Sequence, residues 1–249
     1  MGDGKRLGEF WSFLNMVERN KGRLIIVGDL FELWQSNMSL VLTSWNPLLN
    51  RLAAMKAIYV LGNHDADLLH FCMSSHRLSH PFFKTMATSR TEFADGKSFH
   101  FTHGHWADSY CAGSIPGIGR ITAIYTGLKE DRNGGPFLNK YRTVEAATTG
   151  RLEWVSSVIR WFLRKPNRTQ FGRARLRELL DCYDVVVSGH THLAGQLHTK
   201  DGPLPIYNTG TWAESTCSFV LVNPYGKVGV FDWVGGRISV PNVTKLKVK

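Results

Sequence analysis

The chain has 249 residues, of which 43% are hydrophobic and 20% charged, a composition typical of globular proteins with a sizeable core. No run approaches the roughly 18 apolar residues that a membrane-spanning helix requires, and no apolar signal core follows the charged N-terminus. We therefore expect a soluble, cytoplasmic protein. The formal net charge of +10 favours an anionic partner, which leaves nucleic acid, a phospholipid surface and a phosphorylated substrate open.

Short β-branched runs that end in loops of Gly, Asp, Asn and His recur along the chain. They predict strands at 24–27, 57–61, 98–102 and 184–187. Runs of four or five apolar residues bounded by such loops are typical of strands buried on both faces in a layered α/β fold. The polar loops that follow these strands should then collect at one edge.

Segments with helical periodicity alternate with the first predicted strands. Apolar residues spaced three and four apart predict one helix around 10–17 and a second around 48–55. After Pro203 the chain is mainly β, with strands expected at 206–207, 218–222 and 228–233, the last two joined by a hairpin through 223–226.

The stretch 106–183 has few β runs, and we interpret it as an inserted helical cap within a single domain that spans 1–249. In 151–165, helical geometry places a broad apolar arc between Trp154 and Trp161. A helix of this kind packs on a core or lies at a membrane interface. Peripheral contact with the inner face of a membrane is therefore one expectation.

Four segments combine glycine with metal-ligand side chains where a strand should end. They are Gly28-Asp29-Leu30-Phe31-Glu32, Gly62-Asn63-His64-Asp65, Thr102-His103-Gly104-His105 and Gly189-His190-Thr191-His192. Glycine lets the backbone turn sharply there, so that the neighbouring side chains face the open edge. Together the segments supply oxygen and imidazole ligands.

Hydrolysis of a phosphate ester at neutral pH needs a nucleophilic hydroxide and cancellation of phosphoryl charge, which two metals roughly 3.5 to 4 Å apart provide. Asp29 is the natural bridging carboxylate and Asn63 offers a carbonyl oxygen. His103, His190 and His192 offer nitrogen, and the spacing of the last two lets each address a different ion. Mixed nitrogen and oxygen donors favour manganese, iron, zinc or nickel over calcium.

In this order the motifs resemble those of the calcineurin-like metallophosphoesterase superfamily, over Gly28 to His192. The resemblance implies a metallophosphoesterase-type β-sandwich flanked by helices. It also implies hydrolysis of a phosphoester or pyrophosphate bond by a metal-bound hydroxide. One metal site would consist of Asp29, Asn63, His103 and His190, and the other would include Asp29 and His192.

The resemblance assigns catalytic roles to two further residues. His64 would steady the phosphoryl oxygens or protonate the leaving group, and Asp65 would orient His64 through a hydrogen bond. Glu32 is expected to support its loop rather than bind metal. For His105, contact with substrate or metal and a bond to a backbone carbonyl are equally open.

The family's first motif, Asp-x-His at the end of the first strand, is absent between Met1 and Gly28. The second metal site is therefore expected to lack two ligands. We interpret the gap as a truncated gene model or a fragment, with a natural one-metal or inactive member as the alternative. Loss of that strand should also leave an exposed strand edge.

Three narrower functions remain open. The segment 28–34 is similar to the corresponding motif of UDP-2,3-diacylglucosamine diphosphatases, which predicts a nucleotide-linked lipid substrate. His64, where the best-known members of that family have Arg, and His105 depart from the pattern. The alternatives are a nuclease or cyclic-nucleotide phosphodiesterase on the same fold, and an inactive metal-binding scaffold.

Overall fold

The computed structural model describes residues 4–33, 38–69, 80–107, 176–199, 201–212 and 216–240. The α-helices are α1 (Gly4–Arg19), α2 (Met38–Ser44) and α3 (Asn46–Ala54), and the short 3-10 helices are η1 (Ala66–Leu68), η2 (Pro81–Thr85), η3 (His105–Ala107) and η4 (Leu179–Asp181). The strands are β1 (Ile25–Val27), β2 (Ile58–Val60), β3 (Met86–Ala87), β4 (Ser89–Ala94), β5 (Lys97–Thr102), β6 (Val185–Ser188), β7 (Gly195–Thr199), β8 (Gly202–Asn208), β9 (Ser218–Val222), β10 (Val228–Val234) and β11 (Arg237–Ser239). This mixture confirms the α/β prediction, whereas most of the expected cap lies outside the described residues.

Both expected helices form, and their apolar stripes are buried. In α1 the buried positions are Phe10, Phe13, Leu14 and Val17, as the spacing predicts. The helix α3 carries a proline in its first turn, where the missing N–H is not needed, and buries Leu48, Leu49 and Leu52. Within the part of the chain that the structure describes, no helix combines the length and apolarity needed to cross a membrane.

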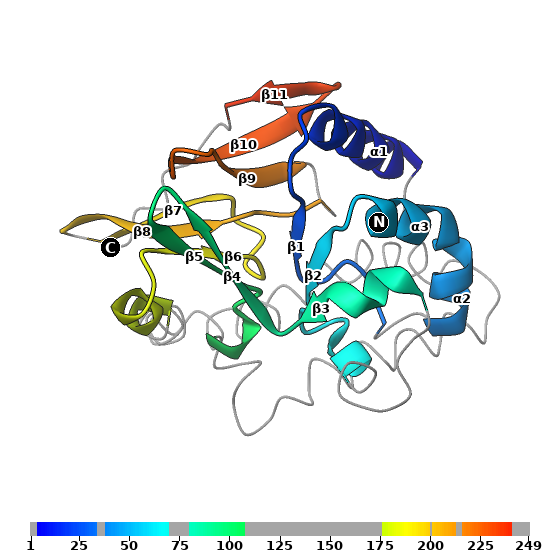
Figure 1. Cartoon of the computed structure of the whole chain (residues 1–249), viewed down its shortest axis with the longest axis horizontal. Coiled ribbons are helices and arrows are strands. Elements are labelled where there is room, and N and C mark those ends of the chain that lie inside the picture. Colours follow the sequence, from blue (N-terminus) through cyan, green and yellow to red (C-terminus); the bar gives the residue numbers. More distant parts are fainter. Residues whose placement is uncertain are drawn as a thin grey trace, which may run out of the picture.

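The strands form three sheets (Figure 1). Strands β1, β2 and β3 are parallel, and β9, β10 and β11 form an antiparallel meander. The third sheet has the order β4-β5-β6-β8-β7, with β5, β6 and β8 parallel. The predicted hairpin between β9 and β10 is confirmed, and the side-chain oxygen of Asn223 accepts the N–H groups of Tyr225 and Lys227 in its turn.

Two apolar clusters show how these sheets are layered. One joins α1 and α3 to residues of both small sheets, including Tyr59 of β2 and Phe219 of β9. The other joins both small sheets to the five-stranded sheet, with Val60 of β2 and Val220 of β9 on one side and Phe101 of β5 on the other. The two small sheets therefore share one layer, which lies between the helices and the five-stranded sheet.

Candidate metal centre

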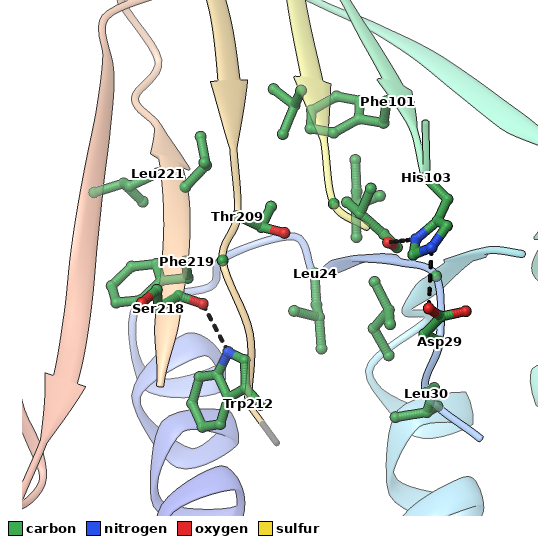
Figure 2. A pocket seen from close by; sticks show the side chains of 18 of the residues that line it. Leu24, Asp29, Leu30, Phe101, His103, Thr209, Trp212, Ser218, Phe219 and Leu221 are labelled. Carbon is green, nitrogen blue, oxygen red and sulfur yellow. Dashed lines mark hydrogen bonds and ion pairs between the residues drawn. The ribbon is translucent and has the colours of Figure 1, made fainter. Parts of the chain in front are cut away.

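The four principal candidate ligands follow the carboxyl ends of four strands. Asp29 follows β1, Asn63 follows β2, His103 follows β5 and His190 follows β6. Strands β1 and β2 are parallel neighbours in one sheet, and β5 and β6 are parallel neighbours in another. In each sheet the loops after the two strands therefore emerge at the same edge. Sequence-distant polar side chains are thereby brought together, as Figure 2 shows for His103 and Asp29.

His103 is at the centre of the cluster and is 2% exposed. Its Nδ1 lies 2.8 Å from the carbonyl oxygen of Val27 and donates to it. Its Nε2 lies 3.0 Å from Oδ1 of Asn63 and 3.0 Å from Oδ2 of Asp29. A histidine whose Nδ1–H is held by a backbone carbonyl presents Nε2 in a fixed direction, which is how proteins orient imidazole ligands of metals.

Asn63 connects His103 to His190. Its Oδ1 lies 3.1 Å from Nδ1 of His190, so the same amide oxygen contacts imidazoles from two different strands. One ligand atom each from Asp29, His103 and His190 lies within 4.8 Å of the other two. These groups are close enough to surround a single ion.

The donor chemistry of the cluster fits a cation. A carboxylate oxygen and an amide oxygen both face Nε2 of His103, and acceptor atoms at such distances repel one another unless a proton or a metal lies between them. Burial opposes charge on both partners, but their mutual hydrogen bond and attraction prevail, raising the pKa of His103 and lowering that of Asp29. Asp29, Asn63, His103 and His190 therefore suit a divalent ion.

His64 is oriented by a different carboxylate from the one expected. Its Nδ1 lies 2.7 Å from Oε2 of Glu32, while Asp65 accepts the Tyr59 hydroxyl and the N–H of Gly62. The carboxylate that holds Nδ1 of His64 is therefore Glu32, and the expected hydrogen bond from Asp65 to His64 stays a prediction. The side chain of Asp65 points into the protein and is fully buried, and its carboxylate stabilises its own loop through these two hydrogen bonds.

Burial disfavours the charged form of His64, but the hydrogen bond to Glu32 and the negative charges of Asp29 and Glu32 outweigh it and raise the pKa of His64. For Asp65, burial prevails over the hydrogen bond from Tyr59 and raises the pKa of its carboxyl to about 6. The two members of the expected catalytic pair thus lie in different environments.

His105 and His192 occupy different positions relative to the cluster. The ring of His105 lies 5.4 Å from that of His103, and its buried Nδ1 has no hydrogen-bond partner among the described residues. Burial and the neighbouring charges of His103 and His190 lower the pKa of His105 to about 4, so this ring is neutral at physiological pH. His192 is exposed and outside the three-residue cluster, but it lines the same cavity as Asp29.

The loops that carry the ligands are strained and tightly packed. Asp29, His190 and His192 have left-handed backbones, with φ of 53°, 69° and 59°. A Cβ added to Gly28 would lie 2.2 Å from Nδ1 of His103, and one added to Gly62 would lie 2.1 Å from Oδ1 of Asp29. These two glycines let the strand ends approach closely enough for the ligands to meet.

Sequence reasoning missed three supporting contacts of the site. The carbonyl of Val27 has no sequence signal, because any residue provides one. The acidic residue at the end of the motif that begins at Gly28 marked Glu32, but its partner could be identified only from the fold. Asn208, in the later turn, donates its side-chain N–H to the carbonyl of Gly189 and so supports the loop of His190.

Carboxylate, amide and imidazole groups at the ends of parallel strands define a candidate divalent-metal centre in a layered α/β protein. The sequence model of the calcineurin-like phosphoesterase family matches residues 4–194, and the chain belongs to this family. Membership implies divalent metal binding and, in general, phosphoester hydrolysis. No curated protein matches the chain.

Two solved structures share similarity over most of the chain. One is a double mutant of Vps29 from Entamoeba histolytica, with 12% identity, a TM-score of 0.42 and coverage of 91% of this chain and 84% of that one. The other is described as a novel archaeal phosphodiesterase, with 12% identity, a TM-score of 0.41 and coverage of 91% and 92%.

Proposed function

We propose that the protein hydrolyses a phosphoester or phosphoanhydride bond with a divalent ion held by Asp29, Asn63, His103 and His190. The observation that carries this proposal is the convergence of these four side chains, with Nε2 of His103 3.0 Å from an oxygen of each of the first two. Mixed oxygen and imidazole donors favour manganese, iron, zinc or nickel.

A bound divalent ion would polarise the phosphoryl group and make water a stronger nucleophile at neutral pH. The chain supplies the remaining groups. Asp29 keeps a negative charge at the centre because its pKa is lowered, and His103 keeps a fixed orientation through Val27. His192, which lines the same cavity, is the proposed ligand of a second ion.

His64 is the proposed group that acts on the substrate. Its side chain is 33% exposed and lines the same cavity as Asp29. The raised pKa of His64 increases the share of its imidazolium form, which can bind a phosphoryl oxygen or protonate a leaving group. Asp65 holds the loop that carries His64 by accepting from the Tyr59 hydroxyl and the N–H of Gly62.

Replacement of His64 tests the proposal. We expect His64→Ala to abolish the Mn²⁺-dependent hydrolysis of bis(p-nitrophenyl) phosphate and to leave Mn²⁺ binding, measured by calorimetry, unchanged. His198→Ala is the matched control, because this imidazole contacts a backbone carbonyl within β7. Full turnover in His64→Ala would contradict the assigned role, and absence of any metal-dependent hydrolysis would favour the inactive scaffold.

The narrower alternatives need a substrate comparison. UDP-diacylglucosamine, a cyclic nucleotide, single-stranded DNA and a simple monoester should be compared at equal concentration. A preference for the lipid would support the lipid-precursor hydrolase with its nucleotide-linked substrate. A preference for a nucleotide polymer or a cyclic nucleotide would support the nuclease or phosphodiesterase alternative.

A further inference from the structure

Three imidazole rings gather where the neighbouring strands β5 and β6 end, and the proposed chemistry uses only two of them. The ring centroids of His103 and His190, the two candidate ligands, lie 5.3 Å apart. The ring of His105 lies 5.4 Å from that of His103 and 6.5 Å from that of His190. The third ring is therefore a neighbour of any ion that the other two hold.

A short turn fixes the position of His105. Gly104 has a left-handed backbone, with φ of 89°, and leads the chain from the end of β5 into the 3-10 turn η3. The N–H of Ala107 donates to the carbonyl of Gly104, and the indole N–H of Trp106 donates to the hydroxyl of Thr102. The backbone that carries His105 is thereby tied to the strand that carries His103.

The two ring nitrogens of His105 lie in different surroundings. The residue is half-buried, but its Nδ1 is fully buried and has no hydrogen-bond partner among the described residues. A buried N–H without an acceptor is rarer in proteins than a buried acceptor without a donor. A neutral imidazole carries its proton on only one nitrogen, so the proton of His105 belongs on Nε2. The ring then has one donor, for which the described part of the chain supplies no acceptor.

Geometry separates His105 from the metal ligands. One ligand atom each from Asp29, His103 and His190 lies within 4.8 Å of the other two, and His105 does not belong to this set. A nitrogen that binds a metal directly lies about 2.1 Å from it. A donor that bonds to an oxygen held by the metal lies about 4 to 5 Å away, the sum of the two bond lengths. The position of His105 fits the second arrangement.

We propose that Nε2–H of His105 donates a hydrogen bond to a non-bridging oxygen of the phosphoryl group that the metal ion binds, and so fixes the orientation of that group. The inference rests on the proposed function, because it requires a phosphoryl group at the ion. A donor forms a stronger hydrogen bond with an anionic oxygen than with a neutral one. His105 contacts the group from the turn after β5, whereas His64 follows β2. His105 is thus a substrate-binding residue rather than a ligand.

Two variants separate the two ring nitrogens. In His105→Gln the side-chain amide can take the place of Nε2, whereas in His105→Asn the shorter side chain reaches only the place of Nδ1. The probe is methylphosphonate, a phosphoryl compound that is not hydrolysed, titrated into the Mn²⁺-loaded protein by calorimetry. We expect His105→Gln to keep the affinity for methylphosphonate and His105→Asn to lose about tenfold, as expected for one hydrogen bond to a charged group. The affinity for Mn²⁺ should be unchanged in both variants.

The same two exchanges at His198 are the matched controls, because Nδ1 of His198 contacts the carbonyl of Gln196 within its own strand. Both controls should bind methylphosphonate as the unaltered protein does. A second measurement needs no variant of His105. Long-range ¹H–¹⁵N spectra of the metal-free protein at about pH 8, above the ordinary pKa of histidine, should show the proton of His105 on Nε2. In the Zn²⁺-loaded protein, methylphosphonate should shift this proton resonance.

Several results would overturn the proposal. Weaker Mn²⁺ binding in both His105 variants would make His105 a ligand. Equal losses of methylphosphonate affinity in the two variants, or no loss in either, would assign the ring to packing. A proton on Nδ1, or no binding of methylphosphonate to the unaltered protein, would also exclude the contact.

Hydrolysis of bis(p-nitrophenyl) phosphate, measured in parallel on the unaltered protein, separates this inference from the proposed function. Metal-dependent turnover together with any of the contrary results would remove only the role of His105. The expected pattern of methylphosphonate binding without turnover would keep the contact with the phosphoryl group and remove the hydrolytic function.

Discussion

Oε2 of Glu32 lies 2.7 Å from Nδ1 of His64, although the two residues are 32 positions apart in the sequence. Their loops follow β1 and β2, which are parallel neighbours, so both emerge at the same edge of the sheet. Both side chains are partly exposed, at 33% for His64 and 40% for Glu32. Solvent therefore screens the pair, and its main effect is to orient the imidazole.

Glu32→Gln should lower the pKa of His64, because the hydrogen bond and charge of Glu32 raise it. An NMR titration of the His64 ring measures this shift directly. We expect kcat to fall about tenfold or more with little change in KM, since positioned proton donors contribute roughly 100-fold or more to catalysis. Glu18→Gln, which removes a carboxylate paired with Arg51 on the surface, should change neither quantity.

Metal binding should weaken as the pH falls. Protons compete with the ion for Nε2 of His103, whose pKa is raised above the ordinary 6.5 by the hydrogen bond and charge of Asp29 despite its burial. We expect lower Mn²⁺ affinity at about pH 6 than at about pH 8, by calorimetry, with release of protons on binding. An affinity that does not depend on pH would show that His103 is not a ligand.

Asp65 should make the metal-free protein less stable as the pH rises from about 4 to about 6. Its folded-state pKa is raised from 3.8 to about 6, so its contribution to stability is complete below 3.8 and is lost as the pH passes 6. A shift of this size corresponds to about 3 kcal/mol. Asp65→Asn should remove this slope in urea unfolding measured across the range, and an unchanged slope would refute the assignment.

Gly28→Ala should abolish metal binding, because its Cβ would collide with the ring of His103. Gly96→Ala is the matched control. Both glycines have positive φ, at 85° and 74°, but an added Cβ at Gly96 has nothing within 4 Å. The control should lose about 1 kcal/mol of unfolding free energy and keep its affinity for Mn²⁺. Equal losses of affinity would mean that backbone strain, rather than the collision, explains the effect.

Two of the four strands that precede the ligands, β2 and β6, could be predicted because they are buried on both faces. In β2 and β6 every residue is buried, which gives the continuous apolar runs that the sequence shows. By contrast, β11 was not predicted, since all its residues are exposed, and neither was β4, in which apolar residues do not alternate clearly with polar ones. Such strands form because a partner strand is available, which local sequence does not reveal.

The candidate ligands could be predicted from their positions after those strands. The orientation of His64 could not, because Asp65 is adjacent in sequence and Glu32 is not. Adjacent side chains on a tight turn often point in different directions, and here Asp65 turns inward to Tyr59. The cavity beside β1 could be foreseen only as an exposed strand edge, because its second wall, β9, comes from a distant part of the chain.

The left-handed backbones of Asp29, His190 and His192 mean that selection for stability and selection for metal binding favour different residues at these positions. Each non-glycine residue in this region costs about 1 kcal/mol. Glycine at any of these positions would relieve that strain and delete a proposed ligand at the same time. A library of variants enriched solely for resistance to heat should therefore drift toward glycine at 29, 190 and 192, whereas enrichment for metal retention should hold the original residues.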